Sequence, residues 1–130
     1  SLLAVTPEAE LPDTGLPQQV ELFERVCQDR GSPPPVIDSR DLLEAPEAML
    51  RALCEAVGIP FDAAMLRWEP GPRPTDGCWA PHWYASVEAS TGFHPYRPKT
   101  EQVPEAKREL LDRSRALYTR LHAHRLLPRG

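Results

Sequence analysis

Residues 45–60, APEAMLRALCEAVGIP, decide much of the fold because they are the clearest helical segment in the chain. Apolar side chains recur there every three or four residues, at Met49, Leu50, Leu53, Cys54 and Val57. Pro46 suits the first turn of a helix, and Gly58 suits the residue just beyond its end. The pattern predicts an amphipathic helix over residues 46–57 with one buried face.

Two other segments have the same helical spacing. Residues 17–30, PQQVELFERVCQDR, place Val20 and Phe23 on one face and end before Gly31. Residues 104–124 repeat leucines at helical intervals and finish with basic side chains, which suit the negative end of the helix dipole. We therefore expect helices near 17–30 and 104–124.

The segments between these helices give weaker signals. A short apolar stretch at residues 36–37 follows three prolines and predicts a brief buried strand, about 35–38, that extends a sheet formed elsewhere. Asp62 is placed to cap a short helical turn. Residues 68–99 contain six prolines and all three tryptophans, which predicts a long irregular loop ordered by its aromatic side chains.

Composition excludes several classes of function. The chain has 130 residues and a formal net charge of −4, without a dense run of lysine and arginine, which disfavours nucleic acid as a partner. No stretch is apolar for the roughly 18 residues of a membrane span. The three cysteines are odd in number and widely spaced, which predicts free thiols and a reducing, cytoplasmic location.

The sequence contains no self-contained catalytic or metal-binding motif. His122 and His124 are two residues apart on a helix and face different ways, so we expect solvated side chains and no metal site. Three acids near a helix start are explained first by capping, namely Asp38, Asp41 and Glu44.

Two segments of the long loop offer candidate chemistry. His82 lies among aromatic residues that would desolvate the imidazole and favour its neutral, basic form, although the pattern favours a hydrogen-bonded structural histidine over a catalytic or ligand-contacting one. Residues 70–77, PGPRPTDG, carry one cation, Arg73, among turn-forming residues. That guanidinium and the backbone amides near Gly77 suit a phosphate or sulfate, although an arginine in a turn is commonly only solvated.

Two long strings in the sequence resemble P-loop sulfotransferases. Residues 36–66, VIDSRDLLEAPEAMLRALCEAVGIPFDAAML, are similar to the strand, acidic turn and proline-started helix that follow the central sheet of that family. Residues 68–96, WEPGPRPTDGCWAPHWYASVEASTGFHPY, resemble the long loop of its bacterial-type subfamily. The resemblance runs from about Ser1 to Tyr96, and the last helix is compatible with it.

The resemblance implies an α/β fold with a P-loop NTPase-like parallel sheet. It also implies transfer of a sulfuryl group from 3′-phosphoadenosine 5′-phosphosulfate to a hydroxyl or amine acceptor. The family's phosphosulfate-binding loop and acceptor-activating residue lie upstream of the matching region, and this sequence has no counterpart of either. We expect residues 1–130 to form a single domain or the C-terminal half of one, and to be inactive alone, so enzyme status stays open.

The resemblance also suggests site residues. Arg73 and Gly77 correspond to an arginine and a glycine-flanked segment that contact the 3′-phosphate, with Trp79 as a wall. Ser1 corresponds to the serine of an arginine–serine pair that binds the same phosphate. The catalytic residue is unknown, with His82 a weak candidate, and no metal is implied.

A second hypothesis belongs to a different class of protein. In it the chain is a non-catalytic helical interaction module, and the loop around Trp79, Trp83 and Tyr84 docks a partner or a second copy. The first hypothesis instead expects a nucleotide and a small acceptor as partners once the fold is complete, with a complementing N-terminal half.

Overall fold

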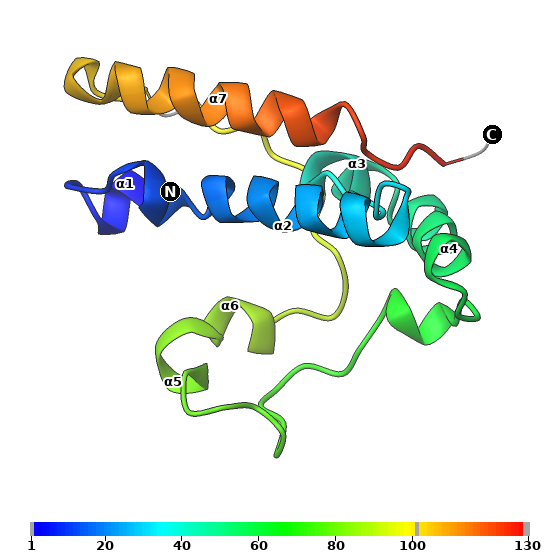
Figure 1. Ribbon diagram of the computed structural model, residues 1–130. Coiled ribbons are helices and arrows are strands. Elements are labelled where there is room, and N and C mark those ends of the chain that lie inside the picture. The colour runs from blue at the N-terminus through cyan, green and yellow to red at the C-terminus, as the bar shows by residue number, and fades with distance from the viewer. Residues whose placement is uncertain (1, 101, 129–130) are drawn as a thin grey trace. The chain divides into compact units, whose positions relative to one another are not determined.

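The structure is a computed structural model that describes residues 2–100 and 102–128 (Figure 1). The chain divides into two compact units, and each is described by itself. The first comprises residues 1–38 and 98–126, and the second comprises residues 39–97 and 127–130.

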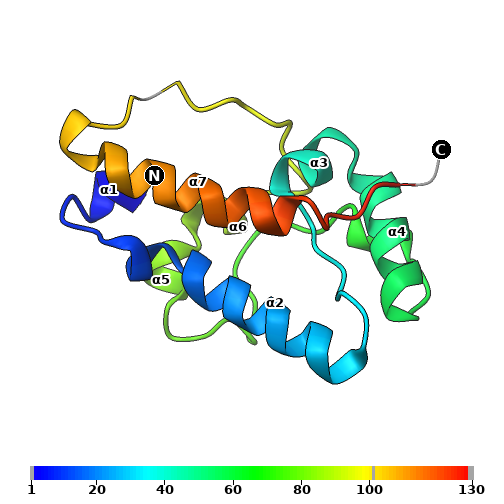
Figure 2. The same ribbon diagram turned by 45° about the horizontal axis from the view of Figure 1, so that its top comes forward.

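The first unit is built on two long helices, α2 (Leu16–Arg30) and α7 (Arg108–His122). Figures 1 and 2 show them side by side. Val20 and Leu121 are buried, and a Glu24–Arg120 ion pair joins the helices. Both helices were predicted from periodicity, and both are confirmed, although residues 105–107 of the second form a separate 3-10 turn, η3.

Short helical turns precede α2. They are α1 (Leu2–Val5) and the 3-10 helix η1 (Leu11–Thr14). Between them Ala9 is almost fully buried, and its carbonyl oxygen accepts a hydrogen bond from Lys107 Nζ at 3.2 Å. This contact ties the N-terminal segment to the start of α7.

The strand expected at residues 35–38 is reduced to a single parallel bridge. Val36 pairs with Arg125, and the Leu126 amide donates to the Val36 carbonyl oxygen at 2.8 Å. Prolines directly before Val36 lack the N–H groups that a longer ladder requires. Within residues 2–100 and 102–128 only isolated bridges occur, so the described structure is helix-rich with little strand.

The second unit begins with α3 (Ser39–Glu44) and α4 (Pro46–Val57). Helix α4 has the predicted bounds, and Met49 and Cys54 on its apolar stripe are buried. Gly58 ends it with a positive φ of 75°, a conformation that glycine adopts without strain. The sequence pattern did not reveal α3.

Asp62 caps the next turn as expected. Its carboxylate accepts from the Ala64 amide at 2.8 Å and starts the 3-10 helix η2 (Ala63–Met65). All three cysteines are free thiols, also as expected.

The long loop is more helical than predicted, because it contains two short helices, α5 (Ala80–Trp83) and α6 (Ala85–Glu88). The segments on either side of these helices are bonded to each other. Arg67 and Gly92 form an antiparallel bridge, and the Gly71 amide donates to the Glu88 carbonyl oxygen at 2.7 Å. We call residues 67–71 and 87–92 the clasp.

Candidate functional site

The loop that the clasp closes carries Arg73 in a tight turn. The backbone amide of Arg73 donates to Asp76 Oδ2 at 2.7 Å, and the Asp76 amide donates to the Arg73 carbonyl oxygen at 2.9 Å. This reciprocal pair fixes the backbone at the base of the side chain. Proline, aspartate and glycine at this spacing favour such a turn, so the sequence indicated it.

The Arg73 guanidinium is exposed and directed back along the loop. Its Nη2 group donates to the Glu69 carbonyl oxygen at 2.8 Å. No other hydrogen bond or ion pair of this guanidinium occurs within the described residues. A planar guanidinium held by one of its donors still presents other N–H groups, which is an arrangement suited to an oxyanion.

The other candidate residues of the loop are exposed as well. Gly77 is exposed, and a Cβ atom there would meet no heavy atom within 4 Å. The Trp79 and Trp83 residues are 65% and 64% exposed, and His82 between them is exposed. These aromatic rings therefore do not enclose His82 in this structure. The Ser1 prediction lies outside the described residues.

A shallow hollow of about 640 Å³ lies against the clasp. Its lining includes the backbone around Glu69, whose carbonyl oxygen holds Arg73, and the Trp68 and Phe93 rings. Those rings meet edge to face with centroids 5.5 Å apart.

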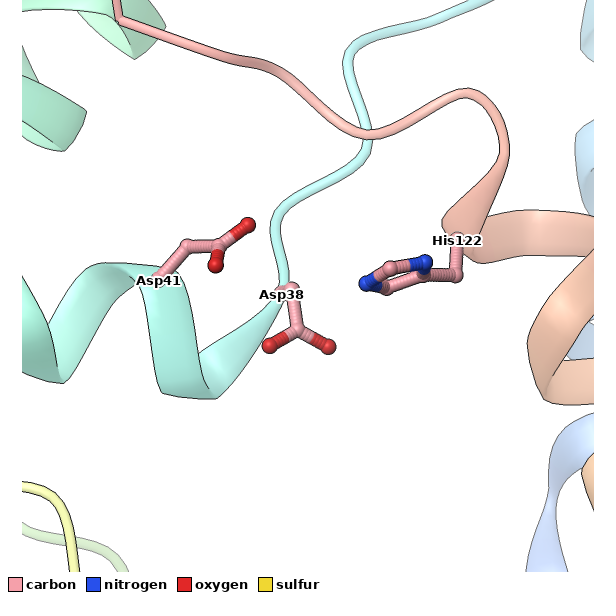
Figure 3. Close-up of side chains that lie close together, drawn as sticks. All are labelled: Asp38, Asp41 and His122. Atoms are coloured by element: carbon pink, nitrogen blue, oxygen red, sulfur yellow. The ribbon is translucent and has the colours of Figure 1, made fainter.

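The first unit contains a separate cluster of titratable side chains. Asp38 is 9% exposed, and its Oδ2 atom accepts a hydrogen bond from the Tyr118 hydroxyl at 2.6 Å. The Tyr118 and His122 rings lie 5.2 Å apart, and a His122 nitrogen lies within 4.8 Å of a carboxylate oxygen of Asp38. Figure 3 shows the edge of the imidazole directed towards Asp38.

The two histidines near the end of α7 have different neighbours. Arg125 Nη1 lies 3.4 Å from His122 Nδ1, and a guanidinium only donates. His124 instead packs on Phe23, with ring centroids 4.9 Å apart.

The predicted capping role of the acids is wrong for α4. That helix begins after Ala45 without a side-chain cap. Glu44 accepts instead from Arg40 Nε at 2.8 Å, and this bond raises the pKa of the Arg40 guanidinium, which keeps it charged. Asp38 is held by Tyr118, a link between residues far apart in the chain that no local pattern could indicate.

No helix in the described ranges is both long and apolar enough to cross a membrane.

A family model described as a sulfotransferase domain matches residues 7–125. The chain therefore belongs to the sulfotransferase domain family, as its motifs suggested.

Two plant proteins are similar to the chain. It is 45% identical over 112 residues to branched-chain-amino-acid aminotransferase-like protein 1 of Arabidopsis thaliana, and 42% identical over 112 residues to protein 2 of the same name. Each alignment covers 86% of this chain and 20% of the relative, so the chain spans about a fifth of their length. No solved structure gives a significant match.

Proposed function

We propose that this chain supplies the part of a sulfotransferase site that holds the 3′-phosphate of 3′-phosphoadenosine 5′-phosphosulfate. One observation carries the proposal: in a chain of this family, Arg73 sits in a hydrogen-bonded turn with its guanidinium exposed. Gly77 contributes backbone amides to the same loop, and the exposed Trp79 ring provides an adjacent wall. Ser1 adds a hydroxyl to the same phosphate.

Charge and geometry support this assignment. A phosphate dianion is bound best by a guanidinium together with backbone amides, because hydrogen bonds between ions are shorter and stronger than neutral ones. Among the residues that the structure describes, the Arg73 guanidinium uses one donor, on the Glu69 carbonyl oxygen, so its remaining N–H groups can bind the anion.

The proposed fold is the parallel sheet of P-loop proteins, of which this chain forms the C-terminal half. The bridge between Val36 and Arg125 supports this proposal, because parallel pairs occur almost only within larger sheets covered on both faces. Further parallel strands beside Val36 would complete the sheet. A cytoplasmic location remains part of the proposal.

The proposed reaction moves a sulfuryl group from the phosphosulfate to a hydroxyl or amine acceptor. The S–O bond to the nucleotide breaks, a bond from sulfur to the acceptor forms, and the acceptor loses its proton. The adenosine 3′,5′-bisphosphate that leaves keeps its 3′-phosphate. Arg73 therefore binds donor and product alike, and His82 is a weak candidate for the base that takes the acceptor's proton.

Calorimetric titration with adenosine 3′,5′-bisphosphate tests the proposal. Because a hydrogen bond to a charged group contributes about 1.5–3 kcal/mol, Arg73→Ala should weaken binding by about ten-fold or more. Arg113→Ala is the matched control, since it removes an exposed arginine of α7 and should leave affinity unchanged. Adenosine 5′-monophosphate, which lacks the 3′-phosphate, should respond to neither substitution. Absence of heat with the unsubstituted chain would refute nucleotide binding by these residues.

A second candidate function rests on the exposed Trp79 and Trp83 rings, which are typical of protein interfaces. In that case the chain is an interaction module, and its loop binds another protein or a second copy. Light scattering after size exclusion separates the two functions. A monomer that binds the nucleotide supports the sulfotransferase site, and an oligomer that ignores the nucleotide supports the interaction module.

A further inference from the structure

We propose that the hydrogen bond between Trp68 and Ser90 positions Arg73 for anion binding, which makes both of them positioning residues. The inference rests on the proposed function, since it concerns the same arginine. Neither residue belongs to the loop segment that would touch the phosphate.

The clasp joins its two segments through backbone and side-chain bonds. The Trp68 amide donates to the Thr91 carbonyl oxygen at 3.2 Å, and the Gly71 amide donates to the Glu88 carbonyl oxygen at 2.7 Å. Residue 69 lies between these two points of attachment. The clasp therefore fixes the position of the Glu69 carbonyl group.

That carbonyl group is the one that holds Arg73. Arg73 Nη2 donates to the Glu69 oxygen at 2.8 Å, so a shift of the clasp moves the acceptor on which the guanidinium rests. The other end of the side chain is held by the turn with Asp76. Position and orientation of the guanidinium thus depend on the clasp as well as on the turn.

Ser90 is the buried polar centre of the clasp, with only 7% of its surface exposed. Its hydroxyl accepts from Trp68 Nε1 at 2.9 Å and donates to the Val87 carbonyl oxygen at 2.6 Å. One hydroxyl thereby links both segments, and its loss leaves the Trp68 indole N–H without this partner, while the Val87 carbonyl oxygen still accepts from the Ser90 amide at 3.0 Å. Glycine at position 92 allows this close approach, because a Cβ atom there would lie 3.0 Å from the Leu66 carbonyl oxygen.

Calorimetry with adenosine 3′,5′-bisphosphate gives the first test. Ser90→Ala should weaken binding about three- to ten-fold, the effect of one hydrogen bond. Ser90→Thr keeps the hydroxyl and should restore affinity, while Ser86→Ala on the exposed surface of α6 should change nothing. Trp68→Phe, which removes the indole N–H but keeps a ring against Phe93, should reproduce Ser90→Ala. Unchanged affinity in both variants would overturn the inference.

A double-mutant cycle separates positioning from a general structural role. If Ser90 acts through Arg73, Ser90→Ala should have no further effect on affinity in a chain that already carries Arg73→Ala. Equal losses in both backgrounds would overturn the inference and leave the proposed function standing. If Arg73→Ala weakens nucleotide binding and Ser90→Ala does not, the inference is likewise overturned and the proposed function stands.

Hydrogen exchange tests the positioning without any nucleotide. The Asp76 amide reports on the Arg73 turn, and the Gly71 amide reports on the clasp. In Ser90→Ala both amides should exchange several-fold faster, while the amides of α4 keep their rates. Unchanged exchange at Asp76 and Gly71 would overturn the inference, whether or not the nucleotide binds.

Discussion

Asp38 and Tyr118 show what a single polar contact does in this chain. The Asp38 carboxylate is almost buried, and burial of a charge is costly unless hydrogen bonds replace water. The Tyr118 hydroxyl provides such a bond at 2.6 Å and so joins the segment after Val36 to α7. The contact lies beside the bridge that brings the C-terminal segment back to Val36.

Tyr118→Phe should therefore lower the free energy of unfolding by about 1.5–3 kcal/mol, since it removes one hydrogen bond to a carboxylate. Urea denaturation measures the change. Tyr84→Phe is the matched control, because no side-chain hydrogen bond of Tyr84 occurs within the described ranges. A Tyr118→Phe variant as stable as the control would show that the contact contributes nothing.

The chemistry of the candidate site was predictable only in part at the scale of residues. The turn at Arg73 follows from its proline, aspartate and glycine neighbours, which act over a few positions. The Trp68–Ser90 bond joins residues 22 positions apart, and the Tyr118–Asp38 bond joins residues 80 apart. Sequence periodicity contains no information about such pairs, so they emerge only from the tertiary structure.

At the scale of elements, the long helices were predictable because two local signals agree in each. Helix α4 has both an apolar stripe and a Pro46–Gly58 boundary, and its predicted bounds are confirmed. Helices α3, α5 and α6 are six residues or shorter, too short for a period to show. The strand expected at residues 35–38 is reduced to one bridge because the prolines before Val36 lack N–H groups, and its partner, Arg125, is too distant in the chain for a local pattern to indicate.

Within helix α4, we expect Met49 to contribute most to the free energy of unfolding, because its side chain is fully buried, with 0% exposure. Met49→Ala should lower the free energy of unfolding by about 2–4 kcal/mol, because it removes buried surface and leaves a cavity. Val57→Ala in the same helix removes a side chain of a residue that is 49% exposed and should cost under about 0.5 kcal/mol. Thermal denaturation compares the two, and equal losses would contradict the assigned burial.

At the scale of the whole molecule, several large apolar residues are exposed. Leu22, Trp79, Trp83 and Leu127 are each more than half exposed. Exposed apolar side chains of this size suit surfaces that pack against further polypeptide.

Such packing would suit the sheet proposed above, in which further strands lie beside Val36. The two plant relatives are about five times as long as the segment they share with this chain. The proposed sulfotransferase site would then combine the Arg73 loop with groups held elsewhere. The central claim nevertheless concerns this chain alone, because Arg73 and its turn are formed within residues 69–76.

Phosphorus NMR tests that claim most directly, because the two phosphates of adenosine 3′,5′-bisphosphate give separate resonances. On titration with the unsubstituted chain, the 3′-phosphate resonance should shift and broaden more than the 5′-phosphate resonance. With Arg73→Ala that selective change should disappear, and with Arg113→Ala it should persist. A 3′-phosphate resonance that stays unperturbed by the unsubstituted chain, or that responds equally to the Arg73→Ala variant, would contradict the account.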